Sequence, residues 1–229
     1  MEKFVLFSNE HILIMVLGII IGFVFLIMGG ITNRKGFAKL SAVIIFILKI
    51  SELAYRHLVL GKDIVQLLPF HLCNLALILV IVMMYTKSKN LFQLSFFWAI
   101  GAPFAILTPD VAFGIGDFAT ISFFITHFYI IFAVAYAYIY FGFRPTIFGF
   151  VESFIALNIV AVLVYFVNDA LGTNYLFVNR VPGFNSPLKY FGEWPYYIVV
   201  VEGIYLVLGY LLYIPFKQKS IKYGKKFFR

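Results

Sequence analysis

The stretch that decides the fold lies near the N-terminus, where residues 11–36 read HILIMVLGIIIGFVFLIMGGITNRKG. Its first twenty residues, His11–Gly30, contain no Lys, Arg, Asp or Glu, and Arg34 and Lys35 follow shortly afterwards. About 20 apolar residues are enough for an α-helix to cross the hydrocarbon core of a bilayer. The stretch therefore predicts a transmembrane helix that ends in a basic loop.

The same pattern continues along the chain. Of the 229 residues, 63% are hydrophobic and 12% are charged, whereas a soluble domain carries about 25% charged residues. We therefore predict an all-α, polytopic membrane protein, a bundle of seven transmembrane helices in a single domain that covers residues 1–229. The predicted spans are His11–Gly30, Ala38–Leu60, Leu67–Tyr85, Leu91–Thr108, Thr120–Tyr140, Thr146–Asn168 and Tyr196–Phe216.

The basic residues of the loops gather on one side of this arrangement. Twelve of the 18 lysines and arginines fall in the first, third and fifth loops and in the tail, and five fall on the other side. Cytoplasmic loops carry the excess of Lys and Arg. This bias predicts an N-terminus outside and a C-terminus in the cytoplasm. The abundance of Phe, Ile, Tyr and Lys is typical of an AT-rich bacterial genome, so we expect a bacterial plasma membrane.

The basic tail, residues 217–229, bears on the partners of the protein. A nucleic acid is one partner for such a tail, but anchoring at anionic lipid headgroups explains it more simply. We expect membrane lipids as partners and no nucleic acid. The single cysteine, Cys73, excludes an internal disulfide and a cysteine-based metal cluster. No phosphate-binding loop, zinc-protease or hydrolase motif is present, so no metal and no cofactor is expected.

Polar residues inside the spans are the candidates for function, because ionisable groups in a membrane are costly and usually face the bundle interior. Lys49, Glu52 and Arg56 fall at i, i+3 and i+7 of the second span, on one helical stripe. Two interpretations stay open. The stripe is either an internal ion network that fixes helix packing or the polar wall of a substrate cavity.

The third span begins with His71, Cys73 and Asn74, at the outer end. Positions i and i+2 of a helix point to nearly opposite sides. His71 and Asn74 are therefore expected to share a face of the helix. A base that deprotonates the Cys73 thiol then has to come from another helix, unless this turn is irregular. His127, about two turns into the fifth span, lies at a matching depth. A buried cysteine is otherwise most often a small hydrophobic residue.

Other polar residues point to the same outer level. Glu202 of the seventh span approaches it from inside the membrane, and Asp110 ends the fourth span at the outer mouth. The long outer connection, residues 169–195, forms either an interfacial aromatic belt or a lid. We therefore predict a pocket in the outer half of the bilayer. A retinal protein is excluded because the seventh span has no lysine for a Schiff base.

Six short motifs, in order along the chain, carry a family resemblance. The chain resembles the bacterial YwaF family of integral membrane proteins, which is similar to the eukaryotic transmembrane protein 164 family. The resemblance covers nearly the whole chain and implies an acyltransferase that remodels phospholipids, with Cys73 as nucleophile and His127 or His71 as base. The motifs are LPFHLC at 68–73, LTPD at 107–110, FFITH at 123–127, RPT at 144–146, NYLF at 174–177 and EWPYY at 193–197.

The leading hypothesis is a membrane-embedded acyltransferase or transacylase that acts on phospholipid or a lipid-linked substrate in the outer leaflet. Cys73 would take the acyl chain as a thioester and His127 would move the proton, with a lipid phosphate held by Lys49 or Arg56. The alternative is a small-solute or proton-coupled transporter, and a third possibility is a purely structural membrane protein. The predicted catalytic residues are Cys73, His127 and His71, and the predicted substrate-binding residues are Asn74, Lys49, Glu52, Arg56, Asp110 and Glu202.

Overall fold

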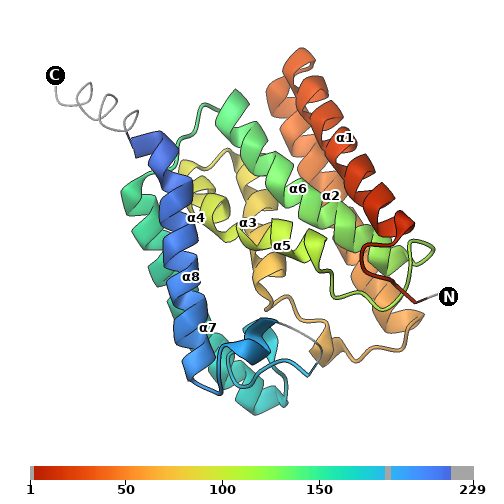
Figure 1. Cartoon of the computed structure of the whole chain (residues 1–229). Coiled ribbons are helices and arrows are strands. Elements are labelled where there is room, and N and C mark those ends of the chain that lie inside the picture. The colour runs from red at the N-terminus through yellow and green to blue at the C-terminus, as the bar shows by residue number, and fades with distance from the viewer. Residues whose placement is uncertain (1–2, 184–186, 218–229) are drawn as a thin grey trace.

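The structure, a computed structural model, describes residues 3–183 and 187–217, and within them it contains helices and no β-strand (Figure 1). Four short 3₁₀ helices lie in the connections and at the end of the last helix: η1 (Ile64–Gln66), η2 (Tyr175–Phe177), η3 (Pro187–Tyr190) and η4 (Ile214–Phe216). The α-helices are α1 (Asn9–Ile31), α2 (Arg34–Leu58), α3 (Leu72–Thr86), α4 (Lys89–Trp98), α5 (Gly101–Leu107), α6 (Phe118–Tyr140), α7 (Ile147–Leu171) and α8 (Tyr196–Tyr213).

Several of these helices are long and apolar enough to cross a membrane. Among the described residues there are five, with α4 and α5 taken together as Lys89–Leu107. The helix α2 has sufficient length, 25 residues, but carries charges along it, and α3 has only 15 residues. The prediction of a helical, multi-pass membrane protein is confirmed. The count of seven spans and the orientation in the membrane stay predictions. The binding of lipid by the basic tail also stays a prediction, because residues 218–229 lie outside the part of the chain that the structure describes.

Glycines on one face of α1 let α6 approach closely. The rings of Phe128 and Phe132 lie against Gly18 and Gly22, and a Cβ on Gly22 would come within 1.9 Å of the Phe132 ring. Helices in membranes associate through such close packing of small residues, because lipid supplies no hydrophobic driving force between them. This contact places α6, with His127, in the middle of the bundle beside α1 and α2 (Figure 1).

The span predicted as Leu91–Thr108 is interrupted in the structure. The helix α4 ends at Trp98 and α5 begins at Gly101. Pro103 has no N–H to donate to the carbonyl of Ala99, four residues earlier, and that carbonyl instead accepts from the Ala102 N–H at 3.0 Å. The proline therefore explains the break in what the sequence pattern indicated as one helix.

Side-chain hydrogen bonds attach α7 to α4. The Gln93 amide donates to the Arg144 carbonyl at 2.9 Å and accepts from the Thr146 N–H at 3.0 Å, just before α7 begins. The Trp98 indole donates to the Ser153 carbonyl at 3.1 Å. Because these bonds lie at two levels of α7, they fix both its position and its rotation.

The helix α8 packs closely against α7 only near its C-terminal end. There Gly209 faces the Phe150 ring, and a Cβ on Gly209 would lie 2.3 Å from it. One turn earlier, the Tyr205 hydroxyl and the Ser153 hydroxyl are 2.9 Å apart and share a hydrogen bond. Nearer the start of α8 the two helices no longer touch so closely, and a cavity lies there.

Candidate functional site

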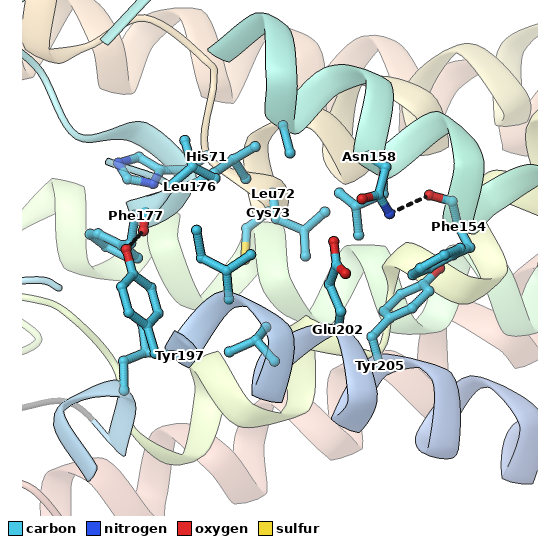
Figure 2. Close-up of a pocket in the computed structure, with 16 residues that line it drawn as sticks. His71, Leu72, Cys73, Phe154, Asn158, Leu176, Phe177, Tyr197, Glu202 and Tyr205 are labelled. Atoms are coloured by element: carbon cyan, nitrogen blue, oxygen red, sulfur yellow. Dashed lines mark hydrogen bonds between the residues drawn. The ribbon is translucent and has the colours of Figure 1, made fainter. Parts of the chain in front are cut away.

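The cavity lies between the beginning of α3, the middle of α7 and the first half of α8, and the connection between α7 and α8 covers it (Figure 2). Its volume is about 340 Å³. Its polar lining comes from His71, Cys73, Asn158, Glu202 and two tyrosines, Tyr197 and Tyr205. The rest of the lining is apolar: Leu72, Phe154, Leu157, Ala161, Leu176, Phe177, Val178, Leu188, Ile198 and Val201.

His71 and Cys73 both line this cavity, against the expectation that they point to opposite sides. That expectation assumed a helix from Leu67 onward, but α3 begins only at Leu72 and His71 is its N-cap, with ψ of 147°. The preceding residues form a tight turn in which the Phe70 N–H donates to the Leu68 carbonyl at 2.9 Å. Since His71 has extended backbone, the spacing rule for helices does not apply to it. The irregular turn brings an imidazole and a thiol to one cavity.

Aromatic rings of the covering segment hold the His71 ring. The Tyr175 ring packs edge-on at 5.1 Å between centroids, and the Phe177 ring lies at 5.3 Å. The Tyr175 hydroxyl donates to the Val65 carbonyl, and the Tyr197 hydroxyl of α8 donates to the Phe177 carbonyl. The covering segment is therefore hydrogen-bonded both to the chain before α3 and to α8, on two sides of the cavity.

Asn168, near the end of α7, holds the connection between α7 and α8 through hydrogen bonds to Tyr175 and Thr173. Its amide nitrogen donates to the Tyr175 carbonyl at 2.9 Å and its amide oxygen accepts from the Tyr175 N–H at 2.7 Å. The Thr173 hydroxyl donates to the same oxygen at 2.8 Å. A fully buried amide that makes these bonds favours one conformation of the backbone that follows.

Two polar side chains face the interior of the cavity from opposite helices. Figure 2 shows the Glu202 carboxylate of α8 directed into it, with Asn158 of α7 on the other side. The Asn158 amide nitrogen donates to the Phe154 carbonyl at 3.1 Å, which leaves the amide oxygen toward the cavity. Within residues 3–183 and 187–217, no hydrogen bond or ion pair reaches Glu202.

The charged stripe of α2 forms an ion network. The Lys49 ammonium lies 2.7 Å from one carboxylate oxygen of Glu52, and the Arg56 guanidinium lies 3.3 Å from the other. Glu52 is only 4% exposed. The predicted pairing of Lys49 with Glu52 is confirmed, and none of the three residues lines the cavity. The interpretation as an internal network therefore fits the geometry better than that of a cavity wall.

This network nevertheless lies close to the candidate catalytic groups. Lys49 lies near both Cys73 and His127, and Arg56 lies near His71. The network therefore places fixed charges behind the beginning of α3.

His127 occupies a separate, buried site in α6. It is 6% exposed, its Nδ1 lies 2.6 Å from the Phe123 carbonyl, and its Nε2 has no hydrogen-bond partner among the described residues. His127 does not line the cavity. Of the two histidines that sequence analysis proposed as base, the structure places His71 in the cavity with Cys73.

The remaining predicted residues lie away from the cavity. Asn74 follows Cys73 but is half-buried on another side of α3, and Asp110 is exposed in the connection before α6. Asn158 and Tyr205, which line the cavity, were not among the predicted site residues. The spacing of the lining residues could have indicated them, because each set lies on one face of a helix. The two sets are residues 154, 157, 158 and 161 on α7 and residues 198, 201, 202 and 205 on α8.

Comparison with known proteins gives the family. An uncharacterized protein of Treponema pallidum (strain Nichols) is similar, with 26% identity over 221 residues, which cover 95% of this chain and 92% of that protein. No solved structure matches the chain significantly. The match to the TMEM164 family extends over residues 6–213. Since this match covers α1 to α8, the chain belongs to the TMEM164 family.

Proposed function

We propose that the protein is a membrane-embedded transacylase that moves an acyl chain between lipids, with Cys73 as the nucleophile, in a bacterial plasma membrane. The observation that carries the proposal is a thiol at the wall of an apolar, covered cavity in a membrane protein. A long acyl chain is the kind of ligand that such a lining accommodates. Membership of the TMEM164 family is compatible with a lipid-related function.

The chemistry divides into two acyl transfers. In the first, the Cys73 sulfur attacks the ester carbonyl of a donor phospholipid, a C–S bond forms, and the ester C–O bond breaks. The thiol proton passes through His71 to the departing alcohol oxygen, which leaves as a lysophospholipid. In the second, the hydroxyl oxygen of an acceptor lysophospholipid attacks the thioester carbonyl, an ester C–O bond forms and the C–S bond breaks. The hydroxyl proton returns to the sulfur through His71.

His71 is the base that the geometry favours. It lines the same cavity as Cys73, and its ring packs against the rings of Tyr175 and Phe177. A base has to come within hydrogen-bond reach of the proton that it takes, directly or through one water. His127 does not line the cavity, so it takes no direct part in the transfer.

The test is trapping of the thioester on the purified full-length protein. Incubation with a phospholipid that carries a labelled acyl chain should give an adduct at Cys73, visible by mass spectrometry and removed by hydroxylamine. Transfer of the label to a lysophospholipid should be lost in Cys73→Ala and nearly lost in Cys73→Ser. Unchanged transfer by a Cys73→Ala protein with unchanged melting temperature contradicts the proposal.

A proton-linked transporter is the second candidate, and Glu202 favours it. A carboxylate in a membrane helix without a partner is typical of proton relays. Proteoliposomes with an imposed pH gradient distinguish the two candidates. The transporter predicts that the gradient drives solute uptake, which Glu202→Gln abolishes and Cys73→Ala leaves intact.

A further inference from the structure

A second hollow lies at the opposite end of the bundle, where α2 begins and α3 ends. It is lined by Lys35, Gly36, Lys39, Tyr85, Thr86 and Lys87, and its volume is about 570 Å³. Two lysines of α2 and the C-cap lysine of α3, Lys87, therefore border one hollow, whose lining includes no Asp or Glu. Neighbouring like charges disfavour one another's charged form, and an anionic ligand relieves that repulsion.

Local contacts hold two of these lysines in place. The Lys39 ammonium lies over the Tyr85 ring at 5.0 Å from its centroid, and the Lys87 ammonium lies over the Phe141 ring at 4.8 Å. Lys87 has a left-handed backbone, with φ of 58°, at the C-cap of α3. This conformation, which is unusual for a residue with a Cβ, turns the chain between α3 and α4.

The three charges are close enough to affect one another. Partial burial, with the charges of Lys35 and Lys39, lowers the pKa of Lys87 from its ordinary value. The beginning of α2 adds the positive end of a 25-residue helix dipole. Asn33 already accepts from the N–H groups of Lys35 and Gly36, so the lysine side chains, rather than the helix N–H groups, are available to a ligand.

The helix surfaces next to the hollow are apolar and exposed. On α2, Val43 follows Lys39 by one turn, and on α3, Val82 and Ile78 precede Thr86 by one and two turns. All three of these aliphatic side chains are more than 40% exposed. A ligand with an anionic head and aliphatic chains matches this surface, whereas a free anion uses only the lysines.

We propose that the hollow formed by Lys35, Lys39 and Lys87 binds the headgroup phosphate of an anionic phospholipid, with its acyl chains along α2 and α3. Basic pockets between transmembrane helices are suited to such headgroups. The site is separate from the Cys73 cavity and does not depend on the transacylase activity. Its ligand is a structural or regulatory lipid rather than a substrate.

Native mass spectrometry of the detergent-solubilised full chain tests this site, with the apparent Kd for phosphatidylglycerol as the readout. The double variant Lys39→Gln/Lys87→Gln should bind about 25-fold more weakly, because each lysine near a phosphate contributes about five-fold. The matched control is Lys89→Gln/Lys217→Gln, two exposed lysines outside the lining. Each double variant lowers the formal net charge from +8 to +6.

Wild type and control should bind phosphatidylglycerol equally, and phosphatidylcholine should bind wild type at least tenfold more weakly. Lys39→Arg/Lys87→Arg should bind like wild type, which separates loss of charge from misfolding. Equal weakening in both glutamine variants, or equal binding of the two lipids, overturns the proposal. Inorganic phosphate should compete only weakly. If it binds as tightly as phosphatidylglycerol, the ligand is free phosphate and the lipid assignment is wrong.

Discussion

At the scale of single residues, two membrane carboxylates differ in what surrounds them. Glu52 lies between Lys49 and Arg56, whereas Glu202 faces a mostly apolar cavity with no partner among the described residues. A buried carboxylate between two cations belongs to a network whose members depend on one another. An unpaired carboxylate in a cavity is available to a ligand or a proton. We therefore propose a structural role for Glu52 and a role in binding for Glu202.

Replacing Glu52 should destabilise the protein strongly. Glu52→Ala leaves Lys49 and Arg56 without their shared anion, and removing one partner of a buried pair costs about 3–5 kcal/mol. Glu202→Gln, the control, removes no ion pair and should leave stability nearly unchanged. Thermal unfolding in one detergent measures both variants. A larger loss of melting temperature in Glu202→Gln would contradict the assignment of roles.

Histidine substitutions test which ring moves the proton. His71→Ala should reduce the rate of acyl transfer by about 10²–10⁴-fold, the usual contribution of a positioned acid or base. His57→Ala, which changes an exposed histidine outside the cavity, should leave the rate unchanged. Initial rates with labelled phospholipid measure this. If His127→Ala removes more activity than His71→Ala at equal stability, the base is His127.

At the scale of elements, close approach between helices is set by where glycines fall. Gly22 of α1 lies against Phe132 of α6, and Gly209 of α8 lies against Phe150 of α7. The first contact places α6, and the second brings α8 to α7 at one end only. The cavity is therefore a consequence of how α8 is attached.

Enlarging Gly22 should weaken the bundle. Gly22→Val introduces a Cβ that would lie 1.9 Å from the Phe132 ring, and such overpacking costs about 1–3 kcal/mol. Gly203→Ala on α8 is the control, because a Cβ there meets nothing within 4 Å. Chemical denaturation in mixed micelles measures the difference. An equal response to both substitutions would show that α1 does not pack on α6 in this way.

At the scale of the whole molecule, the start of α1 and the end of α8 lie at opposite ends of the bundle (Figure 1). This arrangement agrees with an odd number of crossings. The Cys73 cavity is at the end where α3 and α8 begin, and the lysine hollow is at the other. Basic residues concentrate at the hollow's end, which the positive-inside rule assigns to the cytoplasm.

Cysteine accessibility checks the orientation. On a Cys73→Ser background, a membrane-impermeant thiol reagent should label Asp110→Cys and Lys62→Cys in intact cells. It should label Lys89→Cys and Lys217→Cys only after permeabilisation. All four positions are exposed, so access depends on the side of the membrane rather than on burial. Labelling of Lys217→Cys in intact cells would reverse the proposed topology.

The sequence by itself determined the helical, multi-pass class of this protein, because each helix in lipid satisfies its own backbone hydrogen bonds and needs a continuous apolar run. That requirement is local, so residues such as His11–Gly30 reveal it directly. It also indicated that Lys49 and Glu52 pair, since i and i+3 residues lie on one face.

Only the tertiary structure decided which polar residues meet. Periodicity gives the face of a helix but not the partner of that face, so it did not show that Glu202 and Asn158 share a cavity. It also did not show that His71 stands outside the helix and joins Cys73. These outcomes depend on packing between helices distant in sequence and on one irregular turn, where steric fit rather than local hydrophobicity selects the conformation.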